Sequence, residues 1–377
     1  MPQIAYNAHF IRGGTSKGVF FRDDAIPEER PSRDNIFIKA IGSPDPYGRQ
    51  LNGMGGGVSS LSKCVVIGKS EVEGADIDYT FGQVIIGKAE VDYSATCGNL
   101  SSAVGPFAVN TGLLDAVEGQ QKVRVFNTNT SKIYHATFEV RDGMFEPEGD
   151  FEIPGVYGTG SKIRLDYLDP GGATSGKLLP SGNVLDILDV PGVGRVEASL
   201  IDASNALVVV AAERFGKTAT EDVNDLEADK DFMAKMEAVR RVAAVAMGLA
   251  ETPETAAEAN PKIAFVGKAA SAKTLAGTTI AAEDHDIAAR IISMEQVHRV
   301  LTLTGAMCLG VTCRVPGSVA NQICKEQPGD IRLGNPSGIL PVNADVTADN
   351  TGITANSCTA YRTARPLMVG QVLIPAG

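Results

Sequence analysis

The sequence predicts an α+β protein made of two similar halves, each a layer of strands around one central helix. Short runs rich in valine, isoleucine and phenylalanine alternate with glycine, asparagine and aspartate turns, which is typical of strands. Two segments, residues 97–114 and 304–315, open on small polar residues and continue through small apolar ones. Because small side chains let a surrounding sheet approach closely, each segment is expected to form a central helix.

A cluster of glycine and proline at residues 154–182 marks the expected boundary between the halves. The sequence therefore predicts a first domain over residues 1–182 and a second over residues 183–359. The last residues, 360–377, are expected to pack back on the first domain.

The remaining elements follow from hydrophobic spacing. Apolar residues at helical intervals predict a helix over 231–250 and a second over 283–301, with Asp284 as the N-cap of the latter. Eight runs predict strands: 64–68, 79–87, 122–129, 134–140, 184–190, 196–202, 206–212 and 261–269.

Composition excludes several classes of function. The 377 residues carry a net charge of −11 and no tryptophan, which disfavours a nucleic-acid partner. No apolar run approaches the roughly 20 residues of a membrane span, and the N-terminus lacks the pattern of a signal peptide. We therefore expect a cytoplasmic protein that binds neither membrane nor nucleic acid.

Cysteine and histidine show no pattern typical of a metal site. The six cysteines are dispersed and form no CxxC pair, and the four histidines form no HxxxH or HExxH spacing. Reduced thiols and no bound metal are the expectation. Cys308 and Cys313, within the second central helix, are expected to be core residues.

One cysteine stands apart. Cys97 directly precedes Gly98 and Asn99 at the start of the first central helix. A helix N-terminus stabilises a thiolate, and successive backbone N–H groups in a glycine turn can bind an anion. A small hydrophobe packed at a helix start is the alternative reading of this position.

Three further polar glycine turns lie between apolar runs. RGGTSKG (12–18) offers Ser16 and Lys17, SLSK (60–63) ends on Lys63 at the start of a strand, and NPSG (335–338) offers Ser337. Together with the turn at Cys97 they suggest loops that converge on one pocket for a small anion.

With these motifs the sequence resembles the PrpF family of aconitate-type isomerases, whose fold is related to that of diaminopimelate epimerase. The resemblance covers nearly the whole chain and rests on RGGTSKG (12–18), SLSK (60–63), FGQV (81–84), CGNLSSAVGPFA (97–108), PKIAFV (261–266) and NPSG (335–338). It implies two pseudo-symmetric domains, each a sheet rolled about a central helix, with the active site in the cleft between them.

The resemblance also implies the reaction and the residues. Family members move a double bond or interconvert geometry in small unsaturated di- and tricarboxylates, without metal or organic cofactor. Lys63 and Cys97 match the family's proposed catalytic pair. The implied substrate-binding residues are Ser16, Lys17, Gly98, Asn99, Thr304, Gly305, Ser337 and Gly338. Asn335 stands where the family often has histidine, so the contacts of that turn are open.

The expected activity is thus a cofactor-independent isomerase acting by allylic proton transfer, with 2-methylaconitate as first candidate and aconitate, methylitaconate and oxalomesaconate as related ones. Two other readings stay open: an accessory protein that binds a partner dehydratase, and a two-base racemase. A second cysteine in the position that a racemase needs is not evident, because Cys308 lies well inside its segment. The sequence assigns neither the acid nor the base, and it leaves the oligomeric state, a homo-oligomer included, open.

Overall fold

The computed structural model describes residues 3–94, 96–350 and 352–375. The chain divides into two compact units, one of Met1–Asp166 with Tyr361–Gly377 and one of Tyr167–Ala360. It leaves the first unit within β11 (Ile163–Leu168) and returns within β22 (Gly352–Arg362). The division falls before the boundary expected at residue 182. The glycine-rich segment belongs to the second unit because Gly172 and Leu178 form backbone hydrogen bonds with Asp202 there.

Within its described residues, the first unit holds two α-helices, two 3₁₀ turns and a curved sheet. Its helices are α1 (Arg30–Ile41) and α2 (Ser101–Asn110), with 3₁₀ turns η1 (Asp23–Ala25) and η2 (Ser59–Leu61). Its strands are β1 (Gln3–Gly13), β2 (Ser16–Arg22), β3 (Lys63–Lys69), β4 (Ile77–Val84), β5 (Val91–Asp92), β6 (Gly119–Asn127), β7 (Lys132–Arg141), β8 (Met144–Phe145), β9 (Phe151–Glu152), β10 (Thr159–Gly160) and β23 (Ala364–Pro375).

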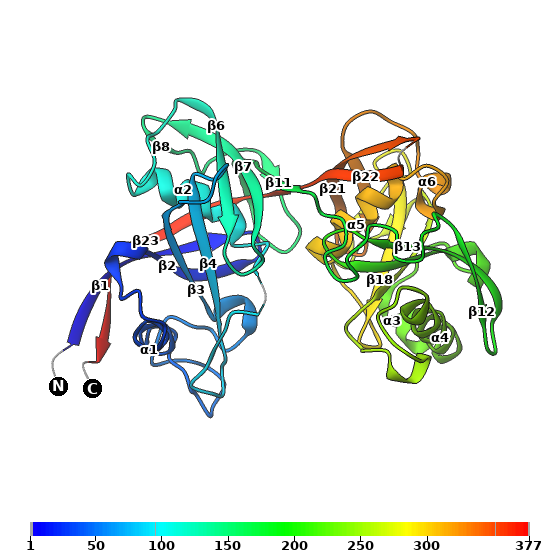
Figure 1. Cartoon of the computed structure of the whole chain (residues 1–377), viewed down its shortest axis with the longest axis horizontal. Coiled ribbons are helices and arrows are strands. Elements are labelled where there is room, and N and C mark those ends of the chain that lie inside the picture. The colour runs from blue at the N-terminus through cyan, green and yellow to red at the C-terminus, as the bar shows by residue number, and fades with distance from the viewer. Residues whose placement is uncertain (1–2, 95, 351, 376–377) are drawn as a thin grey trace. The chain divides into compact units, whose positions relative to one another are not determined.

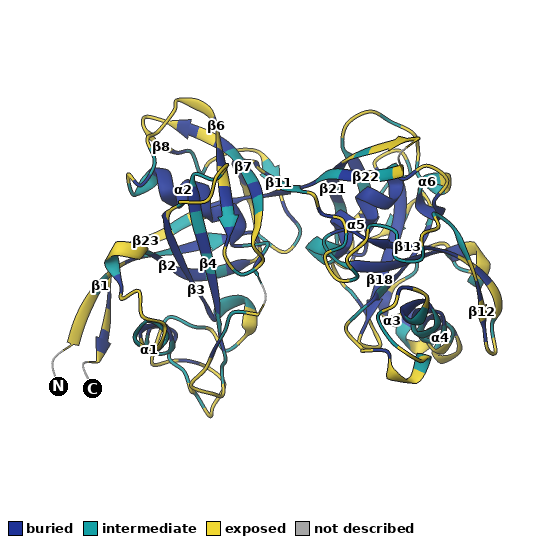
Figure 2. Ribbon diagram, in the orientation of Figure 1, coloured by how far each residue is buried: buried dark blue, intermediate teal, exposed yellow. Residues whose placement is uncertain are grey.

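The sheet of the first unit rolls around α2. β1 pairs antiparallel with β2, β2 parallel with β3, β3 antiparallel with β4, β4 parallel with β6, and β6 antiparallel with β7. α2 packs against β1, β4, β6, β7, β8 and β23, so strands surround it (Figure 1). Every residue from Ser101 to Val109 is buried, which makes α2 the core of the unit (Figure 2).

The C-terminus completes this sheet, since β23 runs antiparallel to β1 from Pro375 opposite Gln3 to Ala364 opposite Gly13. α1 packs on the other face, against β4, β5 and β23, over a core that includes Phe21 and Phe37.

The second unit contains four α-helices, two 3₁₀ turns and its own sheet among the described residues. Its helices are α3 (Val223–Ala228), α4 (Lys230–Ala246), α5 (Leu303–Arg314) and α6 (Val319–Ile323), with 3₁₀ turns η3 (Ala212–Phe215) and η4 (Pro253–Thr255). Its strands are β12 (Asp186–Val190), β13 (Gly194–Asp202), β14 (Ala206–Ala211), β15 (Lys262–Lys268), β16 (Ala272–Lys273), β17 (Thr279–Ile280), β18 (Ile287–Ser293), β19 (Gln296–Val297), β20 (Ile331–Asn335) and β21 (Gly338–Asp349).

The pairing of the second unit repeats that of the first. β13 pairs antiparallel with β14, β14 parallel with β15, β15 antiparallel with β18, β18 parallel with β20, and β20 antiparallel with β21. α5 packs against β13, β14, β20 and β21, as α2 packs within the first sheet. α4 lies in the chain between β14 and β15, as α1 lies between β2 and β3. The two units are therefore structural repeats, which confirms the predicted pseudo-symmetric fold class.

The repeat aligns residue by residue at the central helices. The carbonyl of Cys97 accepts the N–H of Ser101, and the carbonyl of Thr302 accepts that of Ala306. At the same spacing further on, a Cβ on Gly105 would lie 2.5 Å from Phe138 of β7, and one on Gly310 would lie 2.9 Å from Val342 of β21. In this register Thr302 corresponds to Cys97, and α5 begins at Leu303, directly after Thr302, whereas α2 begins at Ser101, four residues after Cys97.

Most predicted elements are confirmed, and one is wrong. All eight predicted strands, both central helices and the helix at 231–250 are present within a few residues of their expected limits. The helix expected over 283–301 is instead the hairpin of β18 and β19, and Asp284 caps no helix there. All of Ile287–Ser293 is buried, so this strand has apolar residues on both faces. Without the alternation of a half-buried strand, the spacing of its apolar residues also matched the helical pattern.

No helix in the described ranges is long and apolar enough to cross a bilayer.

Candidate functional site

Cys97 lies directly before the central helix of the first unit. Its side chain is 7% exposed, and its Sγ accepts the N–H of Leu100 at 3.5 Å. The Ser16 hydroxyl lies 4.0 Å from the same sulfur. Tyr79 and Ser101 hold the peptide by donating their hydroxyls to the Cys97 carbonyl at 3.2 and 3.0 Å. The thiol is thereby fixed at the positive end of α2.

The hairpin between β1 and β2 packs against this turn and needs its glycines to do so. A Cβ on Gly13 would lie 2.7 Å from the Asn99 carbonyl oxygen. Gly14, with φ of +52°, would place a Cβ 2.4 Å from Oδ1 of Asn99. The Asn99 amide donates to Thr15 at 3.1 Å and reaches Ser16 at 3.5 Å. The RGGTSKG hairpin and the CGN turn therefore pack directly against each other.

Lys63 opens β3 with its side chain only 8% exposed. Its Nζ donates to Oε1 of Gln83, directly opposite on β4, at 2.7 Å and lies 4.8 Å from the centre of the Phe81 ring. The Gln83 amide nitrogen donates to the Ser62 carbonyl at 2.9 Å, which fixes the acceptor oxygen toward the lysine. No carboxylate among the described residues is within ion-pair distance of Lys63. A buried ammonium without a counter-ion is costly and is typical of functional sites.

Lys63 and Cys97 lie at the same end of the first unit. Ser16, next to Cys97, starts β2, and Lys63 starts the parallel neighbour β3. Between them, a Cβ on Gly18 would touch both the Lys63 carbonyl and Leu100, each at 3.0 Å. The chain thus brings Lys63, Cys97 and Ser16 to the N-terminal end of α2.

The backbone at this end is open to an anion. Within residues 3–94 and 96–350, neither the N–H of Gly98 nor that of Asn99 donates to an acceptor. Such N–H groups at a helix start favour a negative charge. Lys17 is placed differently: Ser16 and Lys17 alternate across β2, and the Lys17 Nζ lies 5.6 Å from the Phe10 ring. The structure therefore does not group Lys17 with Ser16, and its role stays a prediction.

In the second unit, Thr304 and Gly305 lie in the first turn of α5. The Thr304 hydroxyl is 3.4 Å from the amide nitrogen of Asn205. The Gly305 N–H donates to the hydroxyl of Thr302, the N-cap, at 3.3 Å. A Cβ on Gly305 would lie 2.6 Å from that hydroxyl oxygen. Gly305 therefore serves the cap, and its N–H is already engaged.

Ser337 and Gly338 close the turn between β20 and β21. The Ser337 hydroxyl donates to the Arg299 carbonyl at 2.7 Å, and its N–H donates to Oδ1 of Asn335 at 3.1 Å. Asn335 is 2% exposed, and its amide donates to the Gly338 carbonyl at 2.9 Å. Asn335 thus holds the turn in shape. Substrate contacts by Thr304, Ser337 and Gly338 stay predictions.

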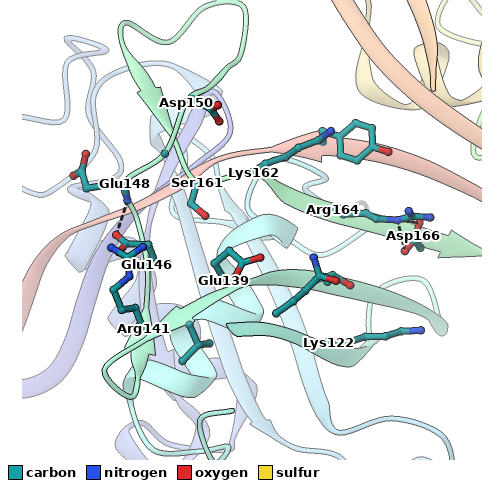
Figure 3. A pocket seen from close by; sticks show the side chains of 15 residues that line it. Lys122, Glu139, Arg141, Glu146, Glu148, Asp150, Ser161, Lys162, Arg164 and Asp166 are labelled. Atoms are coloured by element: carbon teal, nitrogen blue, oxygen red, sulfur yellow. Dashed lines mark hydrogen bonds and ion pairs between the residues drawn. The ribbon is translucent and has the colours of Figure 1, made fainter. Parts of the chain in front are cut away.

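A large cavity of the first unit lies away from these residues. It has a volume of about 780 Å³, and its walls come from β6, β7 and the segment up to β11. Charged side chains of both signs point into it, and Arg141 pairs with Glu146 and Arg164 with Asp166 (Figure 3). None of the predicted site residues lines it. Its mutually paired charges favour a solvated surface over a site for one small anion.

The family is settled by comparison with known proteins. The model of the PrpF protein family matches residues 3–375. The chain belongs to the PrpF family. A 2-methyl-aconitate isomerase of Shewanella oneidensis is 39% identical over 99% of this chain and 98% of its own. A 3-methylitaconate isomerase of Eubacterium barkeri is 36% identical over 97% of this chain and 96% of its own.

A solved structure agrees with this PrpF assignment. The crystal structure of a methylitaconate-delta-isomerase superposes with a TM-score of 0.93 at 35% identity, covering 99% of this chain and 96% of that one. The predicted enzyme class, an isomerase, is confirmed by these relatives, as is the predicted fold. Among the described residues, no group of three or more His, Cys, Asp or Glu side chains could hold a metal ion.

Sequence reasoning missed the residues that hold Lys63 and the turn after Cys97 in place. Gln83, within the quoted FGQV motif, holds Lys63, but a strand glutamine gives no signal of its own. Arg362 donates to Oδ1 of Asn99 at 3.1 Å, and Arg12 donates to the carbonyls of Gly14 and Thr363, each at 3.0 Å. Burial and the charge of Arg365 lower the pKa of Arg12. These contacts join segments far apart in the sequence, so only the fold shows them.

Proposed function

We propose that this chain isomerises a small unsaturated di- or tricarboxylate by moving an allylic proton, without metal or organic cofactor. The first candidate substrate is 2-methylaconitate, since a relative named for it is 39% identical over nearly the whole chain. Methylitaconate is the second, on the names of another relative and of the superposed structure. The observation that carries the proposal is a buried amine without a carboxylate partner at the same end of one unit as a thiol.

Lys63 is the proposed base. As the free amine it takes the proton from the carbon next to the double bond, and the C–H electron pair extends into the conjugated system as a dienolate. Gln83 keeps the nitrogen in place, and the Phe81 ring limits access of water on one side. A base held in one orientation raises the fraction of productive encounters.

Cys97 is the proposed acid. Its thiol returns a proton to the dienolate, either at the remote carbon, which shifts the double bond, or at the same carbon after rotation, which exchanges cis and trans. The thiolate left behind is stabilised by the start of α2 and the Leu100 N–H. Lys63 then carries the extra proton, and exchange with water resets both groups.

The free N–H groups of Gly98 and Asn99 would receive the charge that develops on a substrate carboxylate. Ser16, 2% exposed and facing the thiol, is placed to donate its hydroxyl to the same group. The predicted Lys17, Thr304, Gly305, Ser337 and Gly338 contacts are kept as the weaker part of the proposal, since each makes another contact or faces elsewhere.

The test is a substrate screen by NMR. Purified chain is incubated with 2-methylaconitate, methylitaconate, aconitate and 4-oxalomesaconate, and formation of an isomer is followed over time. At least one of these should convert, and Lys63→Ala and Cys97→Ser should each abolish the conversion. Lys69→Ala, an exposed lysine at the far end of β3, and Cys324→Ser, a partly exposed thiol of the other unit, are the matched controls.

The accessory-protein reading predicts the opposite pattern. A chain kept only to bind a dehydratase would convert none of the four acids, and its function would tolerate loss of both Lys63 and Cys97. Conversion by the wild type at rates that both variants retain would contradict the assigned pair while leaving the isomerase intact.

A further inference from the structure

The structural repeat gives Lys63 a counterpart in the second unit. Lys262 opens β15 as Lys63 opens β3, and the two strands occupy the same place in their sheets. Lys63 donates to Gln83, the residue directly opposite on β4. Lys262 donates at 3.2 Å to Ser293, which lies opposite it because Ile263 pairs with Ile292.

The environment of Lys262 is that of a half-buried cation without a carboxylate partner. Its other hydrogen-bond partner is neutral, the Ala259 carbonyl at 3.2 Å. Within the described ranges no carboxylate forms an ion pair with it. Burial, together with the nearby charge of Arg240, lowers the pKa of Lys262. Half-burying an ammonium beside another cation costs free energy that a bound anion would offset.

A second polar group beside Lys262 also lacks a partner. His298 continues the β18–β19 hairpin, where its N–H donates to the Ile291 carbonyl. Its Nε2 is buried and has no hydrogen-bond partner among the described residues. Burial first, and then the charge of Lys262, lower the pKa of His298, so the ring is neutral at neutral pH and can donate from one nitrogen.

Two residues of this cluster face a cavity. Ser293, which accepts from Lys262, and His298 line a cavity of about 1020 Å³ in the second unit, while Lys262 itself lies behind Ser293 and is not part of its wall. Three acids line the same cavity: Glu237 accepts from Arg240 and Arg241, Glu227 accepts the N–H of Val297, and Glu295 is exposed to solvent in the hairpin turn. The two groups of the cluster that have no charged partner, Lys262 and His298, can both donate a hydrogen bond.

We propose that Lys262, Ser293 and His298 form a carboxylate-binding site of the second unit, the counterpart of the Lys63 site without its thiol. Lys262 supplies the charge, His298 a hydrogen bond, and Ser293 orients the ammonium. Thr302 replaces Cys97 in this copy, so the site binds and does not transfer a proton. The identity of its ligand, a carboxylate of the unsaturated polycarboxylate substrate, rests on the proposed function.

The test is calorimetric titration with propane-1,2,3-tricarboxylate, which has no double bond and cannot be isomerised. Lys262→Met keeps the aliphatic stem and removes the charge, and His298→Phe keeps a ring and removes the donor. Losing one charge-assisted hydrogen bond should weaken binding by about tenfold for Lys262→Met, and less for His298→Phe. Lys268→Met, an exposed lysine at the other end of β15, should bind as the wild type does.

A thermal melt separates binding from a structural role. Removal of a half-buried unpaired charge should leave the melting temperature of Lys262→Met unchanged or higher. The proposal is overturned if Lys262→Met binds the tricarboxylate as tightly as Lys268→Met, if the wild type does not bind it, or if weaker binding comes only with a lower melting temperature. The tricarboxylate binds without reacting, so this titration does not depend on catalysis. A negative binding result would therefore not contradict the roles of Lys63 and Cys97, and binding can be measured even if the chain isomerises none of the candidate acids.

Discussion

The starts of the two central helices, α2 and α5, differ in one decisive side chain. At α2 the Cys97 sulfur accepts the N–H of Leu100, and at α5 the Thr302 hydroxyl accepts the N–H of Gly305. Thr302 is the N-cap of α5, whereas Cys97 lies three residues before Leu100, the N-cap of α2, and no side chain caps that helix. A hydroxyl caps well but does not ionise near neutral pH, whereas a thiol at a helix start can.

The comparison separates what the fold needs from what the chemistry needs. Sheet order, the central helix and a lysine opening the third strand of the repeat recur in both units. At the aligned positions of the two helix starts, the side chain is a thiol at α2 and a hydroxyl at α5. The fold therefore does not need a thiol at either helix start, whereas the proposed proton transfer needs a cysteine before α2.

The largest expected effect is at Lys63. Replacement by alanine should lower kcat by roughly 10²–10⁴-fold, the usual contribution of a general base. Lys69→Ala should stay near the wild type, because that side chain is exposed at the other end of the strand. Initial rates on whichever acid is converted measure both. Equal losses of kcat in Lys63→Ala and Lys69→Ala would show that positive charge on β3, and not a base at Lys63, determines the rate.

Thiol reactivity should separate Cys97 from Cys308, the cysteine inside α5. Cys308 is fully buried, and burial raises its pKa far above the ordinary range, so it should resist iodoacetamide in the native protein. Cys97 should react at least about tenfold faster than Cys308, because its side chain retains some exposure whereas Cys308 has none. Peptide mass mapping after timed labelling gives the rates.

Cys324 is the internal reference for that labelling. It is partly exposed, and its contact with Cys313 lowers its pKa, so it should also react. A tricarboxylate should protect Cys97 and leave Cys324 unaffected. Protection of Cys324, or none at Cys97, would count against the proposed site at α2.

Gln83 should act as a positioning residue. Gln83→Met removes the acceptor of Lys63, and kcat should fall by roughly tenfold, the value of one hydrogen bond of 1–1.5 kcal/mol, with KM little changed. Gln83→Glu places a carboxylate beside the lysine, which favours the charged ammonium. The pH–rate profile of this variant should therefore move to higher pH. A purely structural glutamine would change stability and leave the profile in place.

The smallest expected effect is at Thr302. Thr302→Ala removes the cap of α5 and should cost about 1 kcal/mol of unfolding free energy in urea. Thr302→Ser keeps the hydroxyl and should restore most of that stability. A loss that serine does not restore would mean that packing of the threonine methyl, and not the cap, holds the start of α5.

Sequence patterns predicted much of this fold, and their success follows from local physics. Strands with β-branched runs and the two small-residue helices were recognisable because each carries its own signal, as at 64–68 and 97–114. The failure at 283–301 has the same origin, since a strand buried on both faces offers no alternation to distinguish it from a helix.

The candidate site was predictable only in part. Lys63 and Cys97 follow from motifs and family resemblance, and the structure brings both to one end of α2. Gln83, Arg362 and Lys262 were not assigned, because their roles depend on pairing between distant strands. The N–H of Gly305 donates to the Thr302 hydroxyl, a contact that the sequence analysis did not assign, and a substrate contact by Gly305 stays a prediction.

Hydrogen exchange at carbon tests the central proposal most directly. Each converted acid is incubated in heavy water with wild type, Lys63→Ala or Cys97→Ser, and deuterium at the allylic carbons is followed by NMR. The wild type should incorporate deuterium during conversion, because a proton passes through groups that exchange with solvent, and both variants should lose incorporation together with turnover. Conversion by the wild type without any deuterium at those carbons, or incorporation at wild-type rates in both variants, would contradict the account.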